Sequence, residues 1–276
     1  MNNFKYTSVI VRDVSDSLGE AALRMDDGPV VDMEKVRLQH KEYVRTVRSL
    51  GLKIIKMDAD HSLPDSVFVE DPAVVIGTTV LLPKLGHPSR RPETNAMQKV
   101  FEGIPGMKIH KMEDIDPMAT LDGGDVLFTG QEIFVGQGSR TNERGVKVLS
   151  QVFSGFKVTS IEVNGHLHLK SVCTLAADDT IILATGDDES TGIVKRLQSA
   201  ATGKYKYLEV KGKSSGANCV YIESNDGPTV IHQSFSVYPQ IEQAYNSLKG
   251  RKIAVDTSEL SKVDGCLTCL GIFLTI

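Results

Sequence analysis

The residues best suited to chemistry in this sequence are a thiol, a histidine and several carboxylates, each close to the start of an apolar run. Cys269 follows an acidic turn at 263–265 and precedes the apolar run 270–276. His168 precedes another apolar run, at 171–177. A cysteine becomes a nucleophile when a neighbouring base or positive charge favours its thiolate form. A thiol and a histidine accompanied by carboxylates suggest covalent chemistry on a cationic substrate.

Two aspartates offer a partner for the histidine. Asp122 and Asp125 flank paired glycines, which let the backbone approach other groups closely. Either carboxylate is placed to accept the proton of one ring nitrogen of His168 and so fix its tautomer. A turn with solvated aspartates is the alternative, as is a surface or core position for His168.

A second acidic cluster, Glu70 and Asp71 with Asp65 upstream, lies between apolar segments. Buried carboxylates are costly unless they are paired, and a guanidinium offers a planar set of donors that matches them. Arg90 and Arg140 follow the second strands of their units and are candidates for binding a substrate carboxylate. Solvated loop arginines are the alternative.

The cysteine admits other interpretations. Cys266 and Cys269 have the spacing of a redox dithiol or of half a metal site. A redox pair of this kind normally opens a helix, however, whereas the run 270–276 predicts a strand. A buried, inert cysteine is the remaining alternative.

A repeated unit organises the chain. Each unit has a polar start, an apolar run, a short turn, a second apolar run and a helical stretch. The units start near residues 71, 125, 171, 218 and 269, about 50 residues apart. The expected helices cover 32–50, 93–102, 141–153, 189–200 and 239–248. The last unit retains one apolar run, which the run 6–12 would complete. The spacing favours a closed ring of five units over a doubly wound sheet, and we expect one domain, 1–276.

The composition argues against several classes of protein. The 276 residues carry a net charge of −4 and no block of lysines or arginines, so nucleic acid is not an expected partner. No apolar run approaches the roughly 18 residues of a membrane-spanning helix, and the first residues lack the pattern of a signal peptide. Four cysteines do not resemble a disulfide framework. We expect a cytoplasmic protein that acts on a small molecule and binds no membrane.

A family resemblance is carried by four segments, Phe68–Asp71, Thr120–Gly130, Leu167–Ser171 and Lys262–Cys269. In composition and order they resemble segments of the dimethylarginine dimethylaminohydrolases, and the resemblance extends from near residue 12 to the end. That family belongs to the guanidine-modifying pentein superfamily, whose fold is a five-bladed α/β propeller. The resemblance therefore implies the ring that the spacing favours. It also implies hydrolysis of asymmetric dimethylarginine and monomethylarginine to citrulline and an alkylamine, without a cofactor.

The resemblance implies a role for each member of the catalytic group. Cys269 would attack the guanidinium carbon and form a covalent thiouronium adduct. His168 would protonate the departing amine and then activate a water molecule for the second step. Asp122 would orient His168. The family further implies a link to nitric oxide regulation and a monomer or homodimer.

The resemblance also implies a substrate-binding set, which consists of Leu23, Asp65, Glu70, Asp71, Arg90, Arg140 and Val263. Asp65 and Asp71 would hold the guanidinium, and the two arginines would bind the α-carboxylate. Backbone groups of Leu23 and Val263 would contact the amino-acid end. The segment 17–29, rich in Gly and Asp, would be a mobile lid that excludes water.

One departure from the family is Cys266, where an apolar residue is expected. A Cys266–Cys269 bridge would switch activity off. Inhibitory zinc at Cys269 and His168, joined by His166, is a further expectation, although no metal is required. The rival functions are an arginine deiminase or amidinotransferase of the same superfamily, whose chains are typically longer. A rival from another class is a redox or zinc-binding protein built on the cysteine pair, and a third is a non-catalytic binding protein on the same scaffold.

Overall fold

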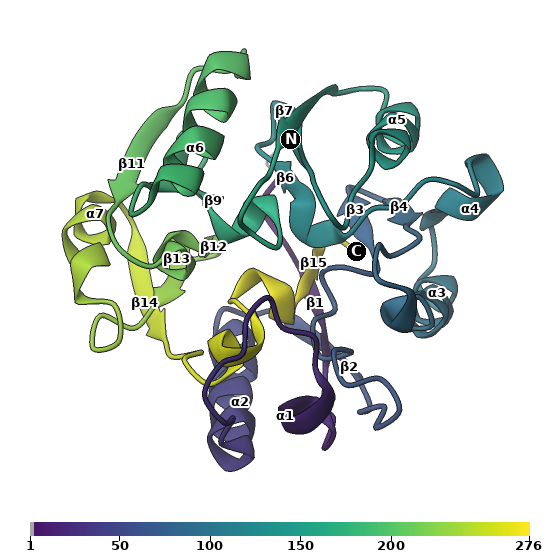
Figure 1. Ribbon diagram of the computed structural model, residues 1–276, viewed down its shortest axis with the longest axis horizontal. Helices are drawn as coiled ribbons and strands as arrows, with labels where there is room; N and C mark the ends of the chain where they lie inside the picture. The colour runs from purple at the N-terminus through teal and green to yellow at the C-terminus, as the bar shows by residue number, and fades with distance from the viewer. Residues whose placement is uncertain (1–2) are drawn as a thin grey trace.

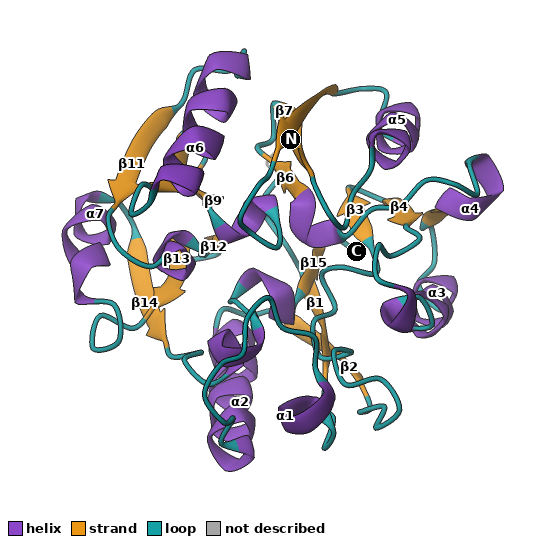
Figure 2. Cartoon of the chain, viewed as in Figure 1, coloured by secondary structure: helices purple, strands orange, loops and turns teal. Residues whose placement is uncertain are grey.

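The computed structural model describes residues 3–276, and within them the strands form five three-stranded sheets. Figure 1 shows these sheets arranged around a central axis, with the larger helices on the outside. Figure 2 shows the larger helices around the periphery and short helical turns near the middle, beside the inner strands. The architecture is a five-bladed α/β propeller, which confirms the fold expected from the spacing of the units and from the resemblance.

Each blade has the same order of strands. The five sheets are β15-β1-β2, β3-β4-β5, β6-β7-β8, β9-β10-β11 and β12-β13-β14. In each sheet the first strand pairs antiparallel with the second, and the third strand pairs parallel with the second. The strands span Ser8–Arg12 (β1), Lys53–Met57 (β2), Val74–Ile76 (β3), Thr79–Leu82 (β4), Lys108–Lys111 (β5), Val126–Phe128 (β6), Glu132–Gln137 (β7), Lys157–Glu162 (β8), Cys173–Ala177 (β9), Thr180–Ala184 (β10), Lys206–Val210 (β11), Val220–Ser224 (β12), Gly227–Gln233 (β13), Arg251–Val255 (β14) and Ile272–Leu274 (β15).

The helices lie close to where the sequence predicts them. They span Leu18–Ala21 (α1), Met33–Ser49 (α2), Glu93–Glu102 (α3), Met112–Ile115 (α4), Glu143–Val152 (α5), Asp188–Ala200 (α6) and Glu242–Ser247 (α7). The side chain of Asp32 caps α2 by accepting from two backbone N–H groups, so the helix begins one residue later than expected. The side chain of Asn142 caps α5 by accepting from Gly145 N, and this helix begins two residues later than expected. The short helices α1 and α4 were not predicted.

The third strand of every blade was also not predicted. These strands, β2, β5, β8, β11 and β14, lie at the edge of their sheets and each begins with an exposed lysine or arginine. Charged residues on edge strands prevent pairing with other chains, but they also weaken the apolar alternation that identifies a strand. The third strands therefore lack the apolar alternation of a strand because their exposed ends carry charged residues.

The two ends of the chain close the ring. β1 pairs antiparallel with β15, so that Val9 lies opposite Phe273 and Ile10 opposite Ile272. The run 270–276 is not one strand, because Thr268–Leu270 forms a 3₁₀ turn and β15 is only three residues long. The turn bonds its own N–H groups locally, as in the contact from Leu270 N to the carbonyl of Leu267, so these groups do not join the sheet. Cys269 lies within this turn.

Tight turns also precede the first strands of other blades. The 3₁₀ turns span Gly123–Asp125 before β6, Leu169–Ser171 before β9, Ser214–Ala217 before β12 and Thr268–Leu270 before β15. Because the same blade geometry recurs around one axis, these entry turns bring their polar residues to one end of the ring. In the described part of the chain, no helix has the combined length and hydrophobicity to cross a bilayer.

Packing at the axis leaves no room for a side chain at Gly123. A Cβ atom there would lie 2.0 Å from the backbone oxygen of Glu70, in the neighbouring blade. We predict that Gly123→Ala lowers the free energy of unfolding by about 2–3 kcal/mol, the upper range for overpacking against backbone. Gly155→Ala is the matched control, since nothing lies within 4 Å of its Cβ position and the change should stay within about 1 kcal/mol. Urea unfolding midpoints provide the test, and equal stability of the two variants would contradict the close blade packing.

Candidate active site

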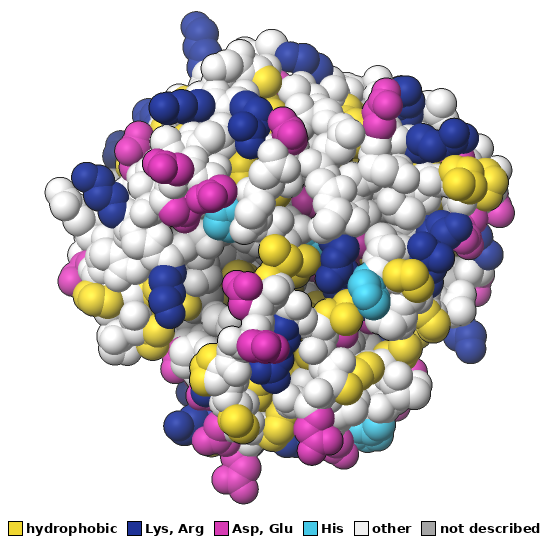
Figure 3. Space-filling model, in the orientation of Figure 1, with side chains coloured by type: hydrophobic (Ala, Val, Ile, Leu, Met, Phe, Trp, Pro, Cys, Tyr) yellow, Lys and Arg dark blue, Asp and Glu magenta, His cyan; other side chains and the backbone are white. Residues whose placement is uncertain are grey.

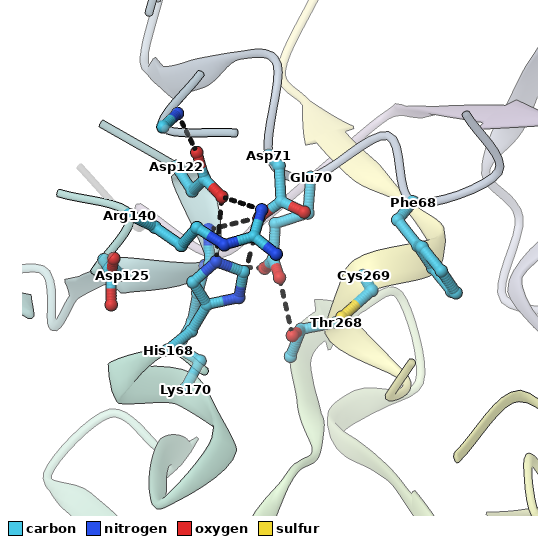
Figure 4. A network of polar contacts seen from close by, with 12 residues as sticks. Phe68, Glu70, Asp71, Asp122, Asp125, Arg140, His168, Lys170, Thr268 and Cys269 are labelled. Carbon is cyan, nitrogen blue, oxygen red and sulfur yellow. Dashed lines mark hydrogen bonds and ion pairs between the residues drawn. The ribbon is translucent and has the colours of Figure 1, made fainter. Parts of the chain in front are cut away.

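A small cavity lies where the polar segments of the blades meet. Eight of the ten residues expected at the site line it, namely Leu23, Asp65, Asp71, Arg90, Arg140, His168, Val263 and Cys269. Its volume is about 20 Å³, which is room for about one water molecule. Asp122 lies directly behind His168, and Glu70 lies elsewhere. In Figure 4, His168 and Cys269 enter the site from different parts of the ring, and the Arg140 guanidinium lies near the His168 ring.

His168 is surrounded by carboxylates. Its Nε2 lies 3.1 Å from Oδ2 of Asp122, and its Nδ1 lies 3.9 Å from Oδ1 of Asp71. Burial alone would lower the pKa of His168, but the charges of Asp71, Asp122 and Asp125 outweigh it and raise the pKa to about 9. The imidazole is therefore protonated at neutral pH and is ready to donate a proton.

The two aspartates around the paired glycines have different partners. Asp122 contacts the His168 ring, whereas Asp125 accepts a hydrogen bond from Thr141 Oγ1 at 2.6 Å and from Leu169 N at 2.9 Å. Asp125 thus fixes the turn that follows His168 rather than the ring itself. Gly124 is required beside them, because a Cβ atom would lie 2.5 Å from Nδ1 of His168.

Cys269 is half-buried and carries its proton in the free protein. Its Sγ accepts a hydrogen bond from the backbone N–H of Cys266 at 3.4 Å. Burial raises the pKa of the thiol well above its usual value, and the negative charges of Glu70 and Asp71 raise it further. The single backbone hydrogen bond acts in the opposite direction and is weaker. The site therefore combines a neutral thiol with a protonated imidazole.

Arg90 is held by carboxylates of the protein, which differs from its expected contact with a substrate carboxylate. Its Nη1 bonds Asp71 at 2.5 Å, and its Nε and Nη2 bond the two oxygens of Glu93 at 2.9 and 2.8 Å. This two-pronged pairing is the geometry in which guanidinium and carboxylate interact most strongly. Burial raises the pKa of Asp71, but His168 and Arg90 outweigh it and lower the pKa to about 2. Glu93 was missed in the sequence because an acid in the first turn of a helix is unremarkable there.

Arg140, in contrast, keeps a donor free. Its Nη1 is buried and has no hydrogen-bond partner, although it lies 3.5 Å from Oδ2 of Asp122. A buried donor without an acceptor costs free energy, and an acceptor on a ligand would recover it. Arg140 is therefore the better placed of the two arginines for a substrate carboxylate.

The segment 17–29, which was expected to be a lid, reaches the site through Leu23. Its backbone N–H lies 3.2 and 3.3 Å from the two carboxylate oxygens of Asp65. Burial raises the pKa of Asp65, and the charge of Arg90 partly offsets this. Val263, the last residue of a 3₁₀ turn at Leu260–Val263, also lines the cavity. Three residues that the sequence did not single out, Phe68, Leu167 and Asp264, complete the wall.

Glu70, which was expected to bind substrate, lies outside the site cavity. It lines a separate cavity of about 180 Å³ that is walled by the first strands of the five blades. Its carboxylate bonds Lys170 Nζ at 2.6 Å and accepts from Thr268 Oγ1 at 2.8 Å. These contacts place Glu70 behind the turn that carries Cys269, where it supports the turn and influences the thiol.

Cys266 and His166 belong to a neighbouring cavity of about 290 Å³. Cys266 is buried and unpaired, and Nε2 of His166 bonds Ser190 Oγ at 2.8 Å. Neither residue lines the cavity that Cys269 faces, so the suggestion that His166 joins Cys269 around zinc is not supported by their positions.

Metal binding at the site itself is also disfavoured. Among residues 3–276, the group of three or more side chains close enough to share an ion consists of Asp71, Asp122 and His168. Arg90 and Arg140 already neutralise these carboxylates. A metal cation would have to displace an arginine and would be repelled by the protonated imidazole.

Comparisons with known proteins identify the family of the chain. A family model described as Arginine deiminase matches residues 59–218. The N(G),N(G)-dimethylarginine dimethylaminohydrolase of Streptomyces coelicolor is 31% identical to the chain over 260 residues, which are 91% of this chain and 93% of that protein. The human protein DDAH2 is 29% identical and is covered to 93%, with 96% of this chain aligned.

A solved structure shows the same fold. It is a cysteine-to-serine mutant of DDAH from Pseudomonas aeruginosa in complex with citrulline. It superposes with a TM-score of 0.83 at 25% sequence identity and covers 98% of this chain and 100% of that chain. The match to these relatives is nearly complete in both directions, and it includes the blades that carry the thiol and the histidine. The chain belongs to the dimethylarginine dimethylaminohydrolase family, within the wider group that the Arginine deiminase model describes.

Proposed function

We propose that this protein hydrolyses N-omega-methylated arginines to citrulline and methylamine or dimethylamine. The observation that carries the proposal is a neutral thiol, Cys269, and a protonated imidazole, His168, facing one acidic cavity. The relatives named for dimethylarginine hydrolysis, and the relative with bound citrulline, support the same substrate class. Four unpaired cysteines support a cytoplasmic location, where thiols stay reduced.

The charge of the site favours a cationic ligand. Six carboxyl groups lie in or directly behind its walls, namely Asp65, Glu70, Asp71, Glu93, Asp122 and Asp264. Four cationic groups accompany them: Arg90, Arg140, His168 and Lys170. The excess of acidic groups suits a guanidinium, whose positive charge would compensate it. Figure 3 shows acidic, basic and hydrophobic side chains interspersed around a central depression on this face.

The first chemical step forms the covalent adduct. Binding of the substrate cation favours loss of the Cys269 proton to solvent, because the new positive charge stabilises a thiolate. The thiolate attacks the guanidinium carbon, and the protonated His168 donates its proton to the methylated nitrogen. The carbon–nitrogen bond breaks, the neutral alkylamine departs, and a thiouronium remains on Cys269. Splitting the reaction in this way lowers the barrier of each step.

The second step releases the product. His168, now neutral, accepts a proton from a water molecule as the oxygen attacks the thiouronium carbon. The carbon–sulfur bond breaks, the thiolate leaves, and citrulline is formed after loss of a proton. Asp122 keeps Nε2 of His168 paired, so the other ring nitrogen, Nδ1, is the one available to the reacting groups.

The amino-acid end of the substrate has its own contacts. The free donor of Arg140 would bind the α-carboxylate, with Arg90 contributing its remaining Nη1 proton. The backbone oxygens of Leu23 and Val263, two residues that line the cavity, would accept from the α-ammonium. Asp65 and Asp71 would hold the guanidinium.

Arginine deiminase activity is the second candidate, because the family model that matches the chain bears that description. The same thiol and imidazole chemistry would then release ammonia from unmethylated arginine. Citrulline release from arginine, monomethylarginine and dimethylarginine, compared as kcat/KM, separates the two. Higher kcat/KM for the methylated substrates selects the hydrolase, and the reverse order selects the deiminase.

The two neighbouring cysteines provide a matched pair of variants. We predict that Cys269→Ser lowers citrulline formation by at least about 1,000-fold, because the covalent step loses its nucleophile. Cys266→Ser should retain activity, since Cys266 is buried beside a different cavity. Equal loss in both variants would instead favour a dithiol mechanism.

The ionisation of the nucleophile should depend on the charge of the ligand. We predict that a non-reactive cationic arginine analogue lowers the pKa of Cys269 by at least about one unit. Unit charges about 4 Å apart interact by about 4 kcal/mol near a protein surface, and one unit corresponds to about 1.4 kcal/mol. Thiolate absorbance measured against pH provides the pKa. Neutral citrulline is the control ligand, and an equal effect of the two ligands would contradict the electrostatic argument.

The acidic surroundings of His168 should set the alkaline limit of activity. The protonated ring is required in the first step and is lost as the pH rises through about 9. Asp122→Asn keeps an acceptor but removes a negative charge, so the pKa of His168 should fall and the alkaline limb of kcat/KM should move to lower pH. Asp187→Asn, next to His166, is the control and should leave the limb in place. If the alkaline limb of kcat/KM in Asp122→Asn stays at the wild-type pH, Asp122 does not set the pKa of His168.

A further inference from the structure

The segment 17–29, which the family resemblance marks as a lid, contributes Leu23 to the wall of the site cavity. With a volume of about 20 Å³ the cavity has no room for an amino acid, so the lid must move before a substrate enters. Most of the lid beyond Leu23 is exposed, and contacts with neighbouring loops hold it in place. The polar contacts that hold the lid therefore control access to the site.

Asp264 makes a second contact with the lid, close to that of Asp65. Its Oδ2 accepts a hydrogen bond from the backbone N–H of Met25 at 2.7 Å. Met25 lies two residues after Leu23, the lid residue that contacts Asp65. Asp264 also lines the site cavity together with His168 and Cys269. One side chain thus joins the lid to the wall of the site.

The backbone of Asp264 has an uncommon conformation. Its φ of 58° and ψ of 12° lie in the left-handed region, and it is the one non-glycine residue between 3 and 276 with positive φ. The conformation ends the 3₁₀ turn Leu260–Val263, and Gly265 N then bonds the oxygen of Leu260 at 3.0 Å. Strained backbone is retained where the surrounding structure or the function requires it. Here it turns the carboxylate toward the lid.

The same loop holds the far end of the lid region. Lys262 Nζ bonds the oxygen of Val30 at 3.0 Å. Glu259 Oε2 accepts from Asp32 N at 2.9 Å and from Lys262 Nζ at 2.7 Å. The loop 259–264 therefore contacts the segment 25–32 at three points, and it continues directly to the turn that carries Cys269.

We propose that Asp264 is the positioning residue that latches the lid over bound substrate and couples lid closure to the loop that carries Cys269. The proposal rests on the function proposed above. A latched lid would hold Leu23 against the amino-acid end of the substrate. An unlatched lid leaves the catalytic residues in place but binds the substrate less well.

Three substitutions separate the latch from backbone strain. D264G removes the carboxylate and relieves the strain, since glycine adopts positive φ freely. D264A removes the carboxylate and keeps the strain, whereas D264N retains an acceptor oxygen and tolerates the left-handed conformation. Asp26→Asn removes the charge of an exposed lid residue and serves as the control.

The latch predicts that D264G and D264A both raise KM for methylarginine by about 10-fold or more, with a smaller change in kcat and a smaller effect in D264N. Amide hydrogen exchange at Met25 should accelerate by a similar factor in D264G and D264A, with no change in Asp26→Asn. If D264G has the KM and the Met25 exchange rate of the wild type while D264A is impaired in both, the latch is wrong, because backbone strain alone would then explain the effect. Hydrogen exchange needs no turnover, so it tests the latch even if the protein does not release citrulline.

Discussion

The buried carboxylate of Asp71 holds together the end of the ring where the site lies. Asp71 is the last residue of the acidic cluster that precedes β3. It bonds Arg90 at 2.5 Å and the backbone N–H of Gly124, in the next blade, at 2.9 Å. It also faces His168 from a third blade. Removing one member of such a network leaves an uncompensated buried charge, which costs about 3–5 kcal/mol. The position of the histidine and the closure of the blades therefore depend on the same ion pairs.

This arrangement has a chemical consequence. The carboxylates that keep His168 protonated also keep Cys269 protonated, because negative charge raises the pKa of both groups. The free site consequently has a proton donor but no thiolate. A cationic substrate changes this balance at the position where the thiolate is needed. The same charge would then provide substrate recognition and activation of the nucleophile, and a free thiol would remain less exposed to oxidants until substrate arrives.

Much of the fold was predictable because it is repeated. The hairpins and larger helices recur about every 50 residues, and polar starts mark the entry to the blades. The outer strands were not predictable, because their exposed lysines and short length hide the apolar alternation. At the site, residue types indicated the thiol, the histidine and the acids. The residues that pair with them were not predicted. Glu93 forms hydrogen bonds with Arg90, and Glu70 lies behind the turn of Cys269 and lines another cavity. Such pairings depend on side-chain direction at the axis, which one sequence does not encode locally.

If this charge balance governs the site, the positive charge of the substrate ionises Cys269. Calorimetric titration with a non-reactive cationic arginine analogue, repeated in buffers of different ionisation enthalpy, counts the protons released on binding. At a pH between the pKa of the free thiol and that of the ligand-bound thiol, wild-type protein should release more protons than Cys269→Ser does, because the thiol is the group that ionises. Equal proton release by the two proteins would contradict this ionisation, since the thiol would then keep its proton when the cation binds.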